Sequence, residues 1–301
     1  MPDSLFGRVF ESPDLDDNAG CGSSTPNPRS GLEEQMPDDV ADALRYRVAP
    51  EVPVEDFDQD LADTARPGLL HELNQAALGD LAVPGLLTYS FVTRWDLDQA
   101  VASLNLGPGR LLLDLACGQG GPGLWLAEQT GCDLVGVDFS ETGLQVARER
   151  AEGLLPGPRT RFQRGDLAAT GLEDASVDGV WCGDAFFFAS DLVEALGEVR
   201  RVLRPGGRVV MTVCVSLDDQ PSAHPLDWRP LLRHVGLHPL RQEETPHDRE
   251  NAMAMYAAWI ANEAELRTEL PARAVDEMLD EARSVGGRLD RMCRVLVVAE
   301  R

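Results

Sequence analysis

The chain has 301 residues, of which 51 are acidic and 27 are basic, so its formal net charge at pH 7 is −24. A surface this acidic repels phosphate backbones and anionic lipids, which argues against nucleic-acid substrates and against membrane surfaces. All 27 basic residues are arginine, so no lysine can act as a general base, a Schiff-base former or a P-loop ligand.

The chain opens with an acidic segment, residues 1–66, that contains 16 acidic residues and 5 arginines. Proline, glycine and serine cluster in "NAGCGSSTPNPRSG", and so little apolar surface cannot offset the entropy lost on ordering. We expect a disordered leader, with a partner-docking tail or a flap over the functional site as alternatives. It contains no signal peptide, the chain contains no membrane-length apolar run, and a cytoplasmic protein is expected.

Helical spacing begins at Leu69, and residues 67–108 are predicted to form N-terminal helices ahead of a main domain at 109–301. Short apolar runs then alternate with amphipathic segments. Strands are expected at 110–114, 132–138, 160–166, 177–183 and 208–215, with helices at 120–129, 141–152 and 191–203. This alternation is typical of a parallel sheet covered on both faces.

The C-terminal third has a different pattern. The expected elements are a helix at 228–235, an edge strand at 238–245, helices at 249–270 and 272–285, and a buried strand at 291–301.

A glycine-rich loop, "DLACGQGGPG" at 114–123, follows the first strand. Gly118, Gly120 and Gly123 satisfy the G-x-G-x-x-G pattern of dinucleotide-binding proteins. Asp138, 20 residues after Gly118, fits the acid that bonds a ribose hydroxyl. These features suit any adenosine-containing ligand that is pressed against the turn, so they leave its identity open.

Other features favour a cationic ligand over a pyrophosphate. Asp114 ends the first strand, where a carboxylate repels phosphate but suits an ammonium or sulfonium group. At the end of the third strand, Asp166 can accept from the amine of adenine while Leu167 packs on the ring. "LRPGG" at 203–207 forms a tight turn into the fifth strand.

Together, "LLLDLACGQG", "LVGVDFS", "RGDLAATGLEDASVDGVWCGDAF" and "VLRPGGRVVMTV" resemble the ordered motifs of class I S-adenosylmethionine-dependent methyltransferases. The resemblance covers about residues 70–301. It implies a Rossmann-like, doubly wound α/β fold with seven strands, the last antiparallel and inserted beside the fifth. It also implies a helical N-terminal extension that covers the cofactor site. Residues 248–287 would form a helical lid between the sixth and seventh strands.

The resemblance assigns the cofactor S-adenosylmethionine to residues at the ends of four strands. The methionine end would be cradled by Asp114, Ala116, Cys117, Gly118 and Gly120. Asp138 would bind the ribose with Phe139 beside the adenine, and Asp166 and Leu167 would define the adenine pocket. Cys182, Gly183 and Asp184 would lie near the methionine amino group and the methyl.

Two positions qualify this assignment. Tyr89, on the N-terminal helices, either closes over the methionine carboxylate or merely packs. Ala116 stands where the family usually has glycine, and we expect tighter packing there rather than loss of binding.

The methyl acceptor is less well specified. The Asn/Asp-Pro-Pro-Tyr signature of amine-modifying enzymes is replaced by "GDAFFF", and a catechol-type metal site cannot be assembled without lysine. The six cysteines form no C-x-x-C pair, so no metal is expected. His224 and His247 are the best-placed candidate bases.

Aromatic residues offer a wall for the acceptor or simply core: Phe186, Phe187, Phe188, Tyr256 and Trp259. The predicted function is methyl transfer to a small, largely apolar metabolite by in-line displacement, at an oxygen, nitrogen or carbon nucleophile. It would depend mainly on proximity and orientation. The alternatives are an NAD(P)-dependent oxidoreductase and a catalytically silent S-adenosylmethionine-binding module.

Overall fold

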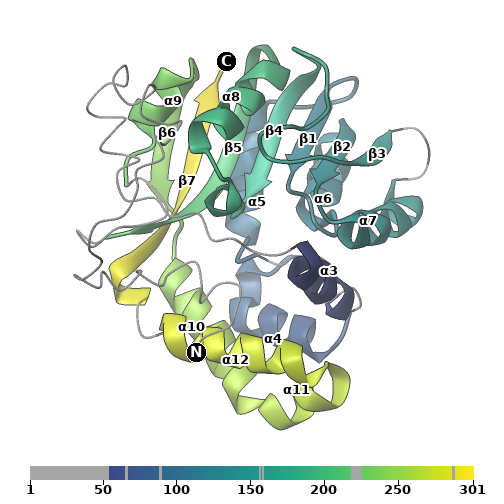
Figure 1. Cartoon of the computed structure of the whole chain (residues 1–301), viewed down its shortest axis with the longest axis vertical. Coiled ribbons are helices and arrows are strands. Elements are labelled where there is room, and N and C mark those ends of the chain that lie inside the picture. The colour runs from purple at the N-terminus through teal and green to yellow at the C-terminus, as the bar shows by residue number, and fades with distance from the viewer. Residues whose placement is uncertain are drawn as a thin grey trace, which may run out of the picture.

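A seven-stranded sheet organises the computed structural model, which describes residues 54–64, 67–87, 90–155, 157, 159–217, 226–286 and 289–301 (Figure 1). The strands are β1 (Leu111–Leu115), β2 (Asp133–Asp138), β3 (Thr160–Arg164), β4 (Val177–Gly183), β5 (Leu203–Ser216), β6 (His238–Glu244) and β7 (Met292–Glu300). Their order is β3-β2-β1-β4-β5-β7-β6. β1 to β5 run parallel, and β7 is antiparallel to both β5 and β6. The predicted Rossmann-like fold, with its last strand beside the fifth, is confirmed.

Helices cover both faces of the sheet and one of its ends. One face carries α8 (Leu192–Val202) and α9 (Arg229–His234), and the other carries α5 (Arg94–Leu104), α6 (Gly121–Thr130) and α7 (Glu141–Leu154). Beyond the carboxyl ends of the parallel strands lie α3 (Val54–Asp63), α4 (Leu69–Leu78), α10 (Asp248–Ala261), α11 (Glu263–Glu269) and α12 (Ala272–Gly286) (Figure 1). Short 3-10 turns occur at Gly79–Leu81, Phe186–Phe188 and Leu289–Arg291. No helix in this described part of the chain is long and apolar enough to cross a membrane.

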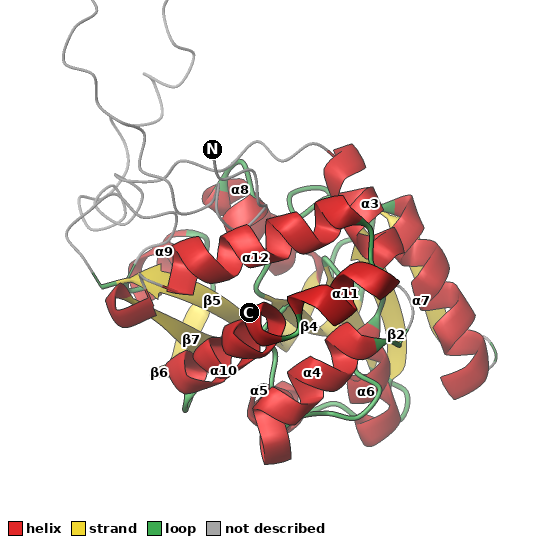
Figure 2. Ribbon diagram, turned by 90° about the horizontal axis from the view of Figure 1, so that it is seen from below, coloured by secondary structure: helices red, strands yellow, loops and turns green. Residues whose placement is uncertain are grey.

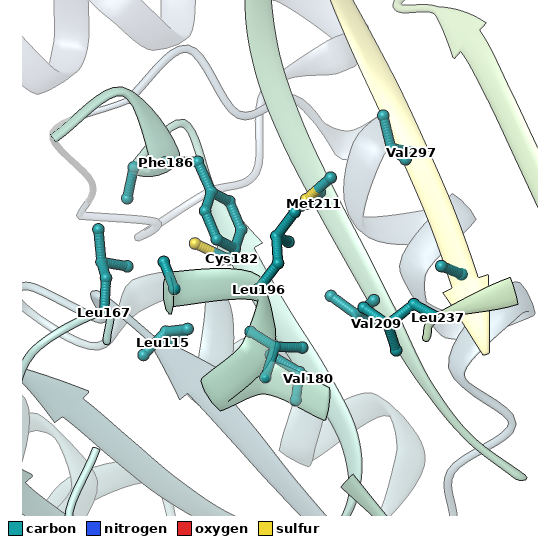
Figure 3. Packing of buried hydrophobic residues seen from close by; sticks show 14 of the residues in the cluster. Leu115, Leu167, Val180, Cys182, Phe186, Leu196, Val209, Met211, Leu237 and Val297 are labelled. Carbon is teal, nitrogen blue, oxygen red and sulfur yellow. The ribbon is translucent and has the colours of Figure 1, made fainter. Parts of the chain in front are cut away.

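Alternation along the strands divides the core into two layers. Leu112 packs with α5 and α6, whereas its neighbour Leu113 joins the cluster beneath α8, because successive strand residues point to opposite faces. Figure 3 shows Cys182, Phe186 and Met211 within that second cluster. Each such fully buried apolar side chain stabilises the fold by about 1.5–3 kcal/mol.

The N-terminal region differs from the sequence-based expectation. Part of the predicted leader, residues 54–63, is helix α3, which packs against α7. The side chain of Ser140 donates a hydrogen bond to Asp58 of α3. The prediction for residues 1–66 was based on their charge and composition, so it missed this helix. The helical spacing of Val54, Phe57 and Leu61 indicates it. Residues 1–53 lie outside the described residues.

The helices α4, α10, α11 and α12 form one assembly, called the cap below. Its hydrophobic cluster combines residues of α4 with residues of α10 and α12. Two hydrogen bonds strengthen it: Tyr256 Oη donates to the buried Glu281 Oε1 at 2.8 Å, and Trp259 Nε1 donates to the half-buried Asn74 Oδ1 at 2.7 Å. Figure 2, seen from below, shows the cap in front of the strands. The helix predicted for 249–270 is therefore two helices, divided at Asn262.

The fifth strand also begins earlier than predicted. β5 starts at Leu203 and includes the "RPGG" segment, where Gly206 has φ +77°. A register shift between Val177 and Gly179 accommodates this bulge in the pairing of β4 with β5.

Candidate functional site

A cavity opens at the carboxyl ends of β1, β2 and β4. Its lining residues come from these strand ends, the glycine loop, α3, the start of α6, the segment before α5 and the turn after β4: Leu61, Ser90, Asp114, Ala116, Cys117, Gly118, Gln119, Pro122, Asp138, Phe139, Trp181, Gly183, Asp184, Ala185 and Phe188. In open parallel sheets, ligands bind in the crevice where the direction of strand order reverses. Here that reversal lies between β1 and β4, which is where the cavity lies.

The glycines of the loop are each required by the backbone or by a close neighbour. Gly118 and Gly120 have φ +49° and +74°, which favours glycine. A Cβ at Gly120 would lie 2.9 Å from the Cβ of Ala147, and one at Gly123 would lie 2.4 Å from Asp114 Oδ2. The third glycine is therefore fixed by a carboxylate that packs on the first turn of α6.

Asp114 is a buried carboxyl group, 2% exposed, at the end of β1. Its Oδ2 accepts a hydrogen bond of 2.9 Å from the Gly123 amide. Burial raises the pKa of Asp114 to about 8, and the nearby charge of Asp138 acts in the same direction. A cation in the cavity would favour the ionised carboxylate, whereas a phosphate would oppose it.

Asp138 ends β2 and holds the glycine loop. Its Oδ2 accepts from the amide of Gly118 at 2.7 Å, and its Oδ1 accepts from the amide of Ser140 at 2.8 Å. Burial raises its pKa, and the bonds from Ser140 and Gly118 act against that rise. Each carboxylate oxygen can accept a second hydrogen bond, so Asp138 can still receive a ribose hydroxyl.

Ala116 has φ +59°, the left-handed region that L-residues other than glycine rarely adopt. The structure therefore adds a backbone effect at this position, and the expectation of tighter side-chain packing stays a prediction. Replacing the family's usual glycine by alanine acts through the backbone, which is strained at the cavity wall.

Asp184, in the turn after β4, belongs to a buried ionic network. Its Oδ1 accepts from Arg294 Nε at 2.8 Å, and Arg294 Nη1 donates to Asp96 Oδ2 at 2.8 Å. Thr245 Oγ1 donates to the other oxygen of Asp96 at 3.2 Å. Although burial lowers the pKa of Arg294, Asp184 and Asp96 hold it well above its ordinary value. The arginine is therefore a permanent cation behind the cavity wall.

Nine of the predicted site residues line this cavity: Asp114, Ala116, Cys117, Gly118, Asp138, Phe139, Gly183, Asp184 and Phe188. They come from three separate stretches of the sequence, 114–118, 138–139 and 183–188, which the sheet brings together. This clustering is the main point on which the structure agrees with the site predicted from the motifs.

Other predicted cofactor residues lie outside the lining. Asp166 is exposed, and its Oδ1 accepts from the Ala168 amide at 3.0 Å. Leu167 and Cys182 pack in the cluster beneath α8 (Figure 3). Burial and the nearby Asp114 raise the pKa of the Cys182 thiol well above its ordinary value, so this thiol is not a nucleophile. Gly120 is packed against Ala147 and Phe162.

Most of the predicted acceptor residues are packed elsewhere. Phe186 lies 6.0 Å from Trp228 in the core, and Phe187 is buried with its ring 4.0 Å from that of Phe188. Tyr256 and Trp259 belong to the hydrophobic cluster of the cap. Within the described part of the chain, Phe188 is the member of this set that lines the cavity.

Of the two candidate bases, His247 has a described position, and that position does not line the cavity. His247 is exposed and precedes α10 with φ +59°. His224 and Tyr89 lie outside the described residues. Among the residues with described positions, no three His, Cys, Asp or Glu side chains are grouped as a metal site would require.

Sequence reasoning missed six residues of the lining: Leu61, Ser90, Gln119, Pro122, Trp181 and Ala185. Gln119 and Pro122 stand within the glycine motif itself, and the periodicity of α3 could have identified Leu61. The side chain of Gln119 donates to the carbonyl oxygen of Leu61 at 2.8 Å, so α3 covers the cavity. No sequence pattern predicts this contact between Gln119 and Leu61, because the two residues are far apart in the chain.

Comparisons with known proteins agree with this geometry. Residues 113–211 match the family described as "Methyltransferase domain". The methyltransferase GfsG of Streptomyces halstedii is 35% identical over 129 residues, which are 42% of this chain and 46% of that protein. The chain thus spans about half the length of this relative.

Solved structures show the same fold at low sequence identity. Phosphoethanolamine N-methyltransferase 2 of Haemonchus contortus, in complex with S-adenosyl-L-methionine, has a TM-score of 0.64 at 19% identity. The alignment covers 84% of this chain and 61% of that one. The 4+2 cyclase SpnF has a TM-score of 0.63 at 18% identity, with 79% and 96% covered. These likenesses establish the fold, and the reaction has to be argued from the residues of the site.

Proposed function

We propose that this chain, which carries a class I S-adenosylmethionine-dependent methyltransferase domain, transfers a methyl group from that donor to a small, largely apolar metabolite. The observation that carries the proposal is the pair of buried carboxyl groups, Asp114 and Asp138, on either side of the glycine loop in one cavity. A donor with an ammonium, a sulfonium and a ribose offers a partner to each of them.

The donor supplies an activated methyl carbon, and this chain's residues bind and align it. Asp114, ionised in the presence of a cation, would bind the charged methionine end. Asp138 would bind the ribose while it holds Gly118 in place. Catalysis would rest on alignment and exclusion of water, since in-line displacement needs no covalent enzyme intermediate.

Helix α3 supports the exclusion of water. Its Leu61 is 2% exposed and lines the cavity, and Asp63 forms an ion pair with Arg273 of the cap at 3.2 Å. The enclosed volume is about 80 Å³, below the roughly 300–1,000 Å³ of typical ligand pockets. Side chains that close the cavity must therefore shift to admit the donor.

The competing oxidoreductase hypothesis rests on the literal G-x-G-x-x-G pattern. It gives no role to Asp114, which would face a pyrophosphate. A thermal-shift experiment with S-adenosylhomocysteine and NADH separates the two hypotheses. We expect S-adenosylhomocysteine to raise the melting temperature and NADH to leave it unchanged. The opposite result would overturn the proposal.

A silent donor-binding module is the second alternative, and the cyclase neighbour shows that this fold is not confined to methyl transfer. Methyl-labelled S-adenosylmethionine, incubated with the protein and a panel of small hydroxyl, amine and alkene compounds, tests it. Transfer of label to any member of the panel rules out the silent module.

A further inference from the structure

The carboxylate of Asp184 is half satisfied. Its side chain is 6% exposed, Oδ1 accepts from Arg294, and Oδ2 has no hydrogen-bond partner in the structure. Asp184 also lines the cavity. A buried carboxylate oxygen without a partner is costly, so its persistence at a cavity wall points to a ligand group.

The backbone holds this side chain in an unusual position. Asp184 has φ +52°, and its amide donates to the carbonyl oxygen and the hydroxyl of Thr212 on β5, at 3.0 and 3.1 Å. Strained backbone that the surrounding structure enforces is typical of functional sites. The constraint comes from β5 on one side and from Arg294 of β7 on the other.

Strand order places Asp184 beyond the donor's methionine end. Asp138 on β2 would bind the ribose, and Asp114 on β1 the charged methionine end. Asp184 comes next, after β4, and is tied to β5 and β7. It therefore lies on the side of the cavity away from Asp138. That side faces β5 and β7, and β7 contacts α10 of the cap.

The surroundings of Asp184 are polar. Asp96 and Arg294 are almost fully buried, and the carboxyl group of Asp248, at the start of α10, interacts electrostatically with Arg294. Burial raises the pKa of Asp248 to about 6. Cys214 of β5 also faces these charges, and burial raises the pKa of its thiol. Of these polar residues, Asp184 is the one that lines the cavity, so its Oδ2 is the polar contact that this group offers to an acceptor.

We propose that Asp184 Oδ2 binds the acceptor's reacting group, a hydroxyl or amine N–H, which narrows the acceptor to an oxygen or nitrogen nucleophile. This inference rests on the proposed function. The neutral acceptor atom attacks the methyl carbon, and its X–H proton passes to Asp184 Oδ2. The carbon–sulfur bond breaks with its electron pair going to sulfur, which leaves a neutral thioether and a protonated Asp184. Arg294 is a positioning residue that fixes the carboxylate through Oδ1.

Sinefungin tests this assignment without a known acceptor, because an amine-bearing carbon replaces the methyl-sulfonium group in that donor analogue. Its amine reaches toward the position of the nucleophile. We expect the wild-type protein to bind sinefungin about tenfold or more tighter than S-adenosylhomocysteine, through a charge-assisted hydrogen bond to Asp184. Isothermal titration calorimetry measures both affinities.

The Asp184→Asn variant should lose this preference and keep its affinity for S-adenosylhomocysteine within about twofold. Asp178→Asn is the matched control, because Asp178 is the second residue of β4 and pairs with Arg110 and Arg204 away from the cavity. It should keep the wild-type preference. Thermal unfolding reports whether each variant is folded.

Three results would overturn the assignment. An equal loss of both ligands in Asp184→Asn would place the carboxylate on the donor's own ammonium group. An unchanged preference would remove Asp184 from the site. Equal wild-type affinities would overturn it even if the variant did not fold. If wild-type protein bound neither ligand, the proposed function itself would fail instead.

The proton-transfer step has its own readout once an acceptor from the panel is found. Asp184→Asn should lower kcat by about 100-fold or more, the usual scale for losing a general base. A kcat equal to that of Asp178→Asn would overturn the step. Transfer of label to the alkene members alone would overturn the restriction to oxygen and nitrogen.

Discussion

The glycine-loop region and the cap are built on opposite principles. In the loop region, residues about 20 positions apart hold the glycine turn, as in the bond from the Gly118 amide to Asp138, and α3 adds a contact across 58 positions through Gln119 and Leu61. The cap joins α4 to α10 across 185 positions through Trp259 and Asn74. The first region keeps buried carboxyl groups against a cavity, whereas the second pairs its polar groups within an apolar cluster. The loop region is thus arranged to bind a ligand, and the cap is arranged to stabilise the packing of its helices.

The largest effect should come from the carboxylate that supports the loop. Asp138→Ala removes the bond to Gly118 and the expected ribose contact, so affinity for S-adenosylhomocysteine should fall by about 10- to 150-fold, or 1.5–3 kcal/mol. Titration calorimetry measures it. Asp133→Ala, on the same strand but in an exposed ion pair with Arg159, is the control. Equal affinities of the two variants would contradict the role of Asp138.

A pH titration sharpens the contrast further. Burial raises the pKa of Asp114 to about 8 in the free protein, and a bound ammonium favours the ionised form. Binding therefore releases a proton, and affinity for S-adenosylhomocysteine should rise by up to about tenfold per pH unit between pH 6 and 8, then level off. Asp114→Asn should remove this slope. A slope that persists in the variant would assign the titration to another group.

In the cap, removing a buried hydrogen bond should lower the stability of the protein and leave its affinity for S-adenosylhomocysteine unchanged. Tyr256→Phe removes the donor to the buried Glu281, which should lower the free energy of unfolding by about 1–3 kcal/mol. Met253→Ala, at an exposed position of the same helix, should change it by less than about 0.5 kcal/mol. Thermal and urea unfolding measure both. Loss of methyl transfer in Tyr256→Phe without loss of stability would instead restore Tyr256 to the acceptor pocket.

The smallest effect concerns backbone strain in the loop. Ala116→Gly should relieve about 1–2 kcal/mol of left-handed strain and add about 0.5–1 kcal/mol of unfolded-state entropy, for a small net gain. Ala175→Gly offers a match away from the cavity, since Ala175 has φ +49°. Calorimetry should show similar small rises in melting temperature. A lower melting temperature in Ala116→Gly but not in Ala175→Gly would contradict the inference that the backbone of Ala116 is strained.

The elements that sequence reasoning located well are those with strong local patterns. The strand predicted at 177–183 is β4, and the acids at the ends of β1 and β2 lie in the cavity. Phe186 shows the limit of this reasoning, because an aromatic residue after a strand suits a core as well as a pocket. Phe186 is a core residue because it packs against Trp228 and the residues of α8.

By itself the sequence determined the sheet, the glycine loop and the aspartates beside it, because strand period, turn chemistry and motif spacing are properties of neighbouring residues. Only the tertiary structure decided that Asp184 lines the cavity while Cys182 is core, and that Asp166 is exposed. It also placed Leu61 as a cover, and Arg294 behind Asp184 from 110 positions away. Such contacts depend on which distant segments pack together, and the packing energy that selects them is shared across the whole core.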